Sequence, residues 1–267
     1  MKDRVISGAL MIAAMLLCMF LSPVTRVLFL SLAALLCAHE YCARLKENGI
    51  RCAFPMMVFL IVGQTVFALR HEKAETWALL FLAIAVLTLI AAIRSQRIGG
   101  VGAVYTLSGL VYPGLFFGAV MYIGASEIWL KAFALACLST WVCDSAAMLG
   151  GKRFGKRKLA PLISPNKTVE GAACGAASSI LVGLVVWLLG LAVPALSGIP
   201  LWLCVVTCLI SSTMGQLGDL AESMLKRMIG IKDFSNLIPG HGGMFDRADS
   251  LLFSIPTAWL CLTLAGA

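Results

Sequence analysis

Charged side chains concentrate in two polar segments of an otherwise apolar chain, residues 150–170 and 222–249. Seven of the 13 acidic residues lie in these segments or near their edges. They are Asp144, Glu170, Asp219, Glu222, Asp233, Asp246 and Asp249. Carboxylate oxygens are the ligands that hard cations such as Mg²⁺ prefer, whereas lysine and arginine bind phosphate. Any chemistry is therefore expected in these two segments.

One polar stripe begins at Asp219. Glu222, Ser223 and Lys226 follow it at offsets of 3, 4 and 7, which places all four residues on one face of a helix. Glu222 and Lys226 could form no more than an intrahelical ion pair. Asp219 has no basic residue one turn before it, so it is the stronger candidate for a functional carboxylate.

Helix-breaking residues, Pro239 to Gly243, precede Asp246, Asp249 and Ser250. Glycine lets a backbone approach a ligand closely and lets its amides point at an anion. The three later residues share a helix face, and with Asp219 nearby they would form an oxygen-rich site for Mg²⁺. The alternative is a favourable interaction of two carboxylates with a helix dipole. His241, inside the run, could bind phosphate, coordinate a metal or brace the turn.

The segment 150–170 is basic and does not match a nucleotide-binding P-loop, since Ala146 and Arg153 stand where that motif needs Gly and Ser or Thr. Its lysines and arginines fit an ordinary cytoplasmic anchor or a patch that contacts lipid headgroups. Ser164-Pro165 is typical of a helix N-cap followed by proline, which predicts a short helix there with Lys167 one turn in.

Asp144 lies six residues before Gly150, inside an apolar run. A carboxylate there costs free energy unless a cation, a partner or water compensates for it. Pairing with the basic residues 152–158 is the alternative to a functional role.

The elements that position these residues must be membrane helices. Of the 267 residues, 60% are hydrophobic and 13% are charged, whereas a soluble domain carries about 25% charged residues. This composition excludes a soluble enzyme, a disordered tail and a fibrous repeat. Only helices and closed barrels satisfy the backbone in lipid, and the apolar runs are long rather than alternating. We therefore predict an all-α polytopic membrane protein.

Nine spans are predicted, with a kink or break at Pro113 in the fifth. They are residues 5–22, 27–43, 53–69, 77–93, 101–123, 128–149, 171–193, 201–222 and 250–266. Residues 1–123 would form an N-terminal region of five spans, and residues 124–267 a catalytic region of four. The ten cysteines include no CxxC pair, and the nine other than Cys52 lie in or beside apolar runs and are interpreted as packing residues.

The basic residues predict the orientation. Assigning the loops alternately puts 17 of the 21 on the side of the N-terminus, so the N-terminus is expected in the cytoplasm and the C-terminus outside. The net charge of +8 favours anionic partners near the membrane surface.

These residues resemble a known family. Ser223 to Arg227, then Lys232-Asp233, then Pro239 to Asp249 resemble the signature of phosphatidate cytidylyltransferases, the CDP-diacylglycerol synthases. Asp144 and Ser164 to Gly171 also resemble that family, although Asn166 stands where lysine is common and Ala248 replaces a larger apolar residue. The resemblance covers the second half well and the first half only by hydropathy.

The resemblance implies an integral membrane enzyme, expected in a bacterial inner membrane, that converts CTP and phosphatidic acid into CDP-diacylglycerol and pyrophosphate. It implies Mg²⁺, leaves a second, monovalent cation open, and implies a homodimer whose polar funnel faces the cytoplasm. No nucleic-acid partner is expected.

The resemblance also implies roles for individual residues. Asp219 and Asp246 would bind the metal, and Asp249 joins them. The catalytic residues would be Asp144, Lys167, Asp219, Lys226, Arg227 and Asp246. The substrate contacts would be Lys152, Ser164, Lys167, Ser223, Lys226, Arg227, His241 and Arg247.

Two rival classes stay open. A CTP-using lipid kinase of the polyprenol kinase type would release CDP instead of pyrophosphate. A transporter or channel would use Asp144, Asp219 and Asp246 as a cation path. The carboxylates cluster at the inner ends of the spans rather than at their middles, which favours an enzyme.

Overall fold

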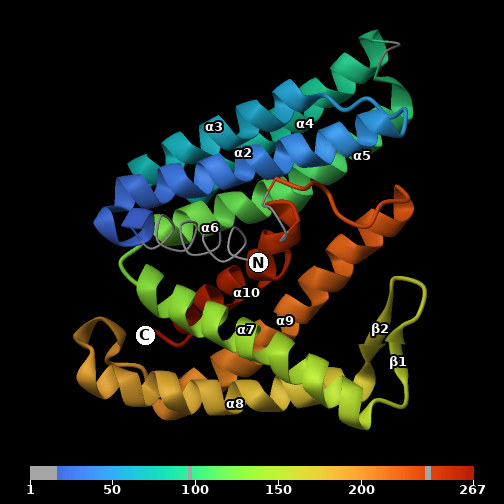
Figure 1. Cartoon of the computed structure of the whole chain (residues 1–267). Coiled ribbons are helices and arrows are strands. Elements are labelled where there is room, and N and C mark those ends of the chain that lie inside the picture. The colour runs from blue at the N-terminus through green and yellow to red at the C-terminus, as the bar shows by residue number, and fades with distance from the viewer. Residues whose placement is uncertain (1–16, 96–97, 238–241) are drawn as a thin grey trace. The chain divides into compact units, whose positions relative to one another are not determined.

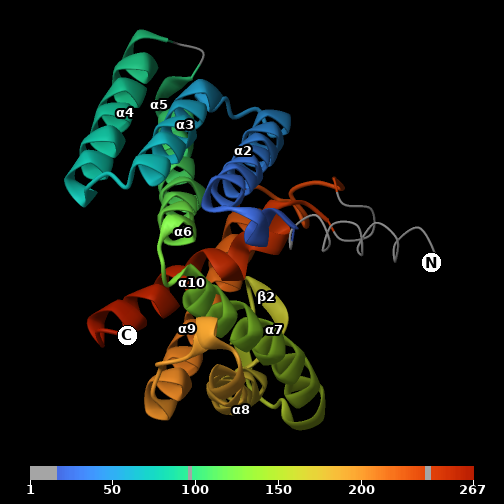
Figure 2. The same ribbon diagram turned by 90° about the vertical axis from the view of Figure 1, so that its left-hand side faces the viewer.

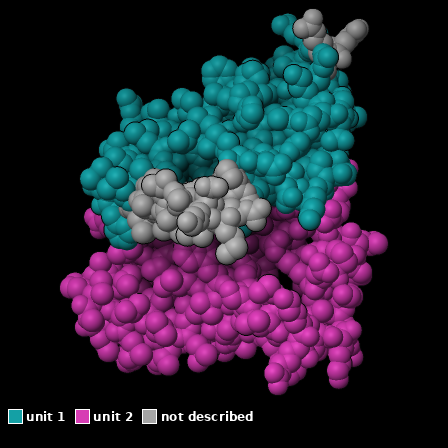
Figure 3. Space-filling model, in the orientation of Figure 1, with its two compact units in different colours: residues 1–126, 229–247 teal, residues 127–228, 248–267 magenta. Residues whose placement is uncertain are grey.

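The computed structural model describes residues 17–95, 98–237 and 242–267. They form two compact units, coloured separately in Figure 3. The first unit comprises Met1–Ser126 and Ile229–Arg247, and the second comprises Glu127–Met228 and Ala248–Ala267.

The first unit is a bundle of helices. They are α2 (Pro23–Glu47), α3 (Phe54–Arg70), α4 (Ala74–Arg94), α5 (Gly99–Gly109), the π-helical η1 (Leu110–Leu115) and α6 (Phe116–Ala125). A capping box of Ser22 and Thr25 begins α2. Helices α2, α3 and α6 pack against one another, while α4 lies along α3 and α5 (Figures 1 and 2).

The break expected at Pro113 is confirmed. Tyr112 has φ −129° and ψ 109°, which are not helical values, and Pro113 follows it inside η1. Proline disfavours a helical conformation in the residue before it and supplies no backbone N–H. The predicted span 101–123 is therefore divided into α5 and α6, joined by η1.

The second unit consists of long helices and one β-hairpin (Figure 1). Helix α7 (Trp129–Phe154) leads into strands β1 (Lys158–Ala160) and β2 (Ser164–Thr168), which pair antiparallel. Then follow α8 (Val169–Ala192), the short 3₁₀ helix η2 (Pro194–Leu196) and α9 (Leu201–Met228). Helix α10 (Phe245–Leu264) starts with three residues of the first unit and continues in the second.

Small residues let α8 pack closely against both of its neighbours. A Cβ atom added to Gly171 would lie 2.6 Å from the Ala147 carbonyl oxygen of α7. A Cβ atom on Gly183 would lie 2.6 Å from Val205 Cα of α9. Contact through small residues is the usual way for membrane helices to associate.

The prediction that a helix starts at Ser164-Pro165 is wrong. Residues Ser164–Thr168 form β2, and α8 begins only at Val169. Thr168 is its N-cap, since the Thr168 Oγ1 accepts a hydrogen bond of 3.1 Å from the Gly171 N–H. Pairing with β1 keeps Pro165 and Lys167 in an extended conformation, so Lys167 precedes the helix.

The prediction of a helical membrane protein is confirmed at that level. Six helices of the described residues are long and apolar enough to cross a membrane. They are Pro23–Glu47, Glu75–Arg94, Gly99–Ala125, Trp129–Phe154, Val169–Ala192 and Leu201–Met228. The shorter α3 is also apolar, and the predicted last span coincides with α10, which is not among the six. Most of the predicted first span, 5–22, lies outside the described residues.

Candidate active site

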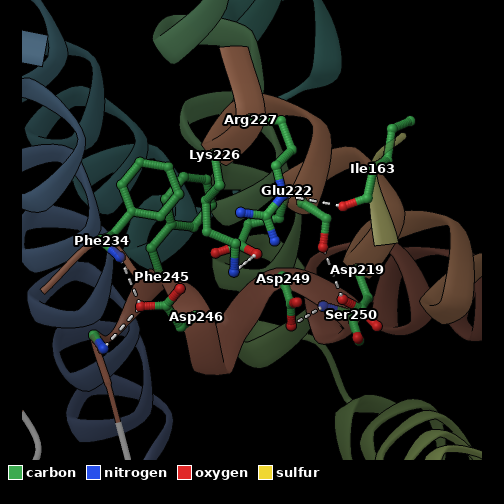
Figure 4. A network of polar contacts seen from close by, with 12 residues as sticks. Ile163, Asp219, Glu222, Lys226, Arg227, Phe234, Phe245, Asp246, Asp249 and Ser250 are labelled. Carbon is green, nitrogen blue, oxygen red and sulfur yellow. Dashed lines mark hydrogen bonds and ion pairs between the residues drawn. The ribbon is translucent and has the colours of Figure 1, made fainter. Parts of the chain in front are cut away.

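Three carboxylates of the second unit meet in one group, here named the carboxylate cluster: Asp219, Glu222 and Asp249. One oxygen of each lies within 4.8 Å of the others. Asp219 and Glu222 come from the polar end of α9, and Asp249 comes from the first turns of α10 (Figure 4). All three ligand atoms are carboxylate oxygens, so the group fits a hard divalent cation such as Mg²⁺.

Glycines of α9 bring the cluster together. A Cβ atom on Gly218 would lie 2.6 Å from the Asp249 carbonyl oxygen, and one on Gly215 would lie 3.5 Å from that of Ser250. The backbones of α9 and α10 therefore nearly touch beside Asp219. The Ser250 N–H also donates a 2.6 Å hydrogen bond to Asp249 Oδ1.

Two lysines balance part of the negative charge. Lys167 Nζ pairs with Asp219 Oδ2, and Lys226 Nζ pairs with Glu222 Oε2. Glu222 is fully buried, whereas the Lys167 and Asp219 side chains are 28% and 29% exposed. The intrahelical pair of Glu222 and Lys226 thus exists, and Glu222 belongs to the cluster as well.

Excess negative charge remains at the cluster. The three carboxylates of the cluster carry one more negative charge than the two paired lysines can balance. Asp144 of α7 lies close enough to interact electrostatically with both Asp219 and Lys167. A bound cation would stabilise the ionised form of each of these carboxylates.

The hairpin that carries Lys167 is fastened at its base and at its turn. At the base, a Glu170 oxygen accepts hydrogen bonds of 2.9 Å and 3.1 Å from the backbone N–H groups of Lys156 and Arg157. At the turn, the Arg227 Nε donates a 3.2 Å bond to the Ile163 carbonyl (Figure 4). Arg227, predicted as a substrate contact, therefore also orients the hairpin.

In the first unit, the segment before α10 holds Asp246. Asp246 Oδ2 accepts hydrogen bonds from the backbone N–H groups of Phe234, at 3.0 Å, and Gly243, at 2.9 Å. The Phe234 and Phe245 rings pack with their centroids 4.7 Å apart. Asp246 lies in the first turn of α10, three residues before Asp249.

The remaining predicted contacts come from several elements. Lys152 is exposed in the last turn of α7, and Ser164 is the first residue of β2. Ser223 Oγ lies 3.5 Å from Asp219 Oδ1. Arg247 is in the first turn of α10. His241 lies outside the described residues.

Two carboxylates were not predicted in the roles that their contacts suggest. Glu222 carried a usable signal, since it follows Asp219 by three residues on the same helix. Glu40 of α2 contacts Met244 and Phe245, about 200 residues later in the chain, and no local pattern marks such a contact.

Comparison with known proteins places the chain in a family. A family model described as the cytidylyltransferase family matches residues 2–265. A phosphatidate cytidylyltransferase of Staphylococcus haemolyticus is 30% identical over 265 residues, which cover 96% of each chain. Those of Staphylococcus saprophyticus and Bacillus subtilis are each 35% identical, covering 79% and 78% of this chain and 78% and 76% of their own. This chain therefore belongs to the cytidylyltransferase family.

Proposed function

We propose that this protein transfers the cytidylyl group of CTP to phosphatidic acid, forming CDP-diacylglycerol and pyrophosphate for phospholipid biosynthesis. The observation that carries the proposal is family membership along almost the whole chain, shared with bacterial phosphatidate cytidylyltransferases. The carboxylate cluster with its two lysines supports it, because this reaction needs a bound cation and phosphate-binding groups together.

The chemistry explains why no activating base is needed. A phosphate oxygen of phosphatidic acid attacks the α-phosphorus of CTP, a new P–O bond forms, and the bond to the β-phosphate oxygen breaks. The nucleophile is already an anion, so the main obstacle is repulsion between two highly negative substrates. Catalysis then consists of positioning and charge neutralisation.

The protein's own groups suit that task. Asp219, Glu222 and Asp249 would hold Mg²⁺, with Asp246 one turn earlier on α10 as the further ligand. Bound Mg²⁺ would neutralise charge on the triphosphate. If the carboxylates bound the cation, Lys167 and Lys226 would be released from their ion pairs and could bind phosphate oxygens. The proposal leaves a second, monovalent cation open.

Other predicted roles are retained as proposals. Asp144 would tune the charge at the site, and Arg227 would meet phosphate. The further substrate contacts would be Lys152, Ser164, Ser223, His241 and Arg247.

We further propose the finer topology: nine spans in a bacterial inner membrane, with the N-terminus and the active site in the cytoplasm and the C-terminus outside. The uneven distribution of the basic residues supports this orientation, since 17 of 21 would lie inside. Residues 124–267 would form the catalytic region, residues 1–123 its N-terminal membrane region, and the protein a homodimer.

The direct test is pyrophosphate release by the purified protein in detergent. We expect release only when CTP, phosphatidic acid and Mg²⁺ are all present, and its loss when any one is omitted. Release of CDP would instead indicate a lipid kinase. Absence of both products with every component present would contradict the proposal.

A further inference from the structure

A buried carboxylate in the first half of the chain contacts the segment that leads into α10. Glu40 of α2 is only 4% exposed. Its Oε1 accepts hydrogen bonds from Ser235 Oγ, at 2.5 Å, and from the Met244 N–H, at 2.9 Å. Its Oε2 accepts a 2.9 Å bond from the Phe245 N–H. All these donors belong to the first unit.

Neighbours of Glu40 on α2 contact the same segment. Arg44, one turn later, donates a 2.5 Å hydrogen bond from Nε to the Phe234 carbonyl. The Tyr41 ring packs on the Phe234 ring, with centroids 6.3 Å apart. We name Glu40, Tyr41 and Arg44 the α2 anchor, and residues 229–237 and 242–247 the entry segment.

The residues that the anchor holds are those that bind Asp246. Phe234 offers its carbonyl to Arg44 and its N–H to Asp246 Oδ2. Gly243, the second donor to Asp246, lies between two carboxylates. A Cβ atom there would lie 2.7 Å from Glu40 Oε2 and 2.9 Å from Asp246 Oδ2. These two donors to Asp246 thus lie directly beside the anchor.

The chemistry of Glu40 suits this position. An ionised carboxylate only accepts hydrogen bonds, and two of its partners here, the backbone N–H groups of Met244 and Phe245, can only donate. Burying a carboxylate is costly unless such bonds compensate. In a glutamine, an NH₂ group would replace one of the two carboxylate oxygens. Either the Met244 N–H or the Phe245 N–H would then lose its acceptor.

We propose that Glu40 is a positioning residue: it fixes the entry segment and the start of α10, so that the Asp246 carboxylate is presented in one orientation. The inference rests on the proposed function, in which Asp246 binds Mg²⁺. It assigns to α2 a part in the chemistry of the second half of the chain.

The test compares Glu40→Gln with Glu75→Gln, the same change at an exposed position in the first turn of α4. The concentration of Mg²⁺ that gives half-maximal pyrophosphate release should rise about tenfold in Glu40→Gln, as expected when support for a metal ligand is lost. It should stay unchanged in Glu75→Gln. A merely structural role would lower the amount of active enzyme and leave this concentration unchanged.

A second measurement uses metal-free protein. In hydrogen exchange with a chelator present, the peptide covering residues 242–249 should exchange faster in Glu40→Gln than in the wild type. Peptides of α8 should be unaffected in both variants. Unchanged exchange in residues 242–249 would overturn the inference, because the bonds to Met244 and Phe245 would then not hold this segment.

A milder variant covers the case in which Glu40→Gln does not fold. Ser235→Ala removes one of the three donors to Glu40 and should shift both measurements in the same direction by a smaller amount. An unchanged Mg²⁺ requirement in that variant would then overturn the inference. The experiment separates this inference from the proposed function. An inactive wild type would contradict both proposals. An active wild type with an unchanged Mg²⁺ requirement in Glu40→Gln would contradict only the role of Glu40.

Discussion

At the scale of single residues, each candidate metal ligand is already engaged by donors of the protein. Asp219 and Glu222 are paired with lysines, and Asp246 accepts two backbone hydrogen bonds. These contacts hold the carboxylates in defined orientations. Substitutions that keep shape but remove charge therefore test the chemistry more cleanly than truncations.

Asp246→Asn should keep the fold and lose most turnover. An asparagine oxygen can still accept from Phe234 and Gly243, while the charge available to the metal is gone. We expect a loss of kcat on the order of a hundredfold. The measurement is pyrophosphate release alongside the melting temperature.

The control is Glu75→Gln, the same loss of charge at an exposed carboxylate in the first turn of α4, which should retain activity. Near-normal turnover in Asp246→Asn would show that Asp246 is not a metal ligand.

Lys167→Ala should weaken substrate binding more than it weakens stability. The ammonium pairs with Asp219 and, in the proposed reaction, is released to phosphate. Losing a charged hydrogen bond of about 1.5 to 3 kcal/mol lowers kcat/KM roughly ten- to a hundredfold. Lys158→Ala, at an exposed position of β1, is the control for the change itself. If KM and kcat both stay the same, Lys167 does not contact phosphate.

At the scale of elements, the close approach of α9 to α10 positions the carboxylate cluster. Gly218→Ala would place a methyl group 2.6 Å from the Asp249 carbonyl oxygen and push the two helices apart. We expect a loss of about 1 to 3 kcal/mol in stability, as for overpacked cores, together with a higher Mg²⁺ requirement. Thermal unfolding and Mg²⁺ titration of the activity measure these two effects.

Gly100→Ala in α5 is the control, since a Cβ atom there would meet no atom within 4 Å. Equal melting temperatures for the two variants would mean that the helix contact at Gly218 adapts without cost.

The elements also show what the sequence could and could not reveal. Helical spacing placed Asp219, Glu222 and Lys226 on one face because the helical repeat is local. The same local reasoning failed at Ser164-Pro165, where capping residues suggested a helix. Pairing with β1 decided the conformation there, and that pairing depends on a partner strand. The partners of Glu40 could not be predicted, because they are close to it only in the folded chain.

At the scale of the whole molecule, the proposed orientation can be tested with the hairpin. Lys156, Arg157 and Lys158 are exposed and lie in the polar link between α7 and α8. Trypsin should cleave there in inside-out vesicles and should spare the site in sealed right-side-out vesicles. Cleavage only in the right-side-out preparation would reverse the assigned topology.

The packing of α8 determines which changes the second unit can tolerate. Gly171, Gly175, Ser179 and Gly183 are buried and recur every four residues, and a methyl group on any of the three glycines would meet a neighbouring helix at less than 3 Å. The opposite side presents Leu181, Leu184 and Leu188. On the glycine side of this helix, even a substitution to alanine would therefore push a neighbouring helix away. On the leucine side, one apolar side chain can replace another, so this surface can vary with the lipids around it.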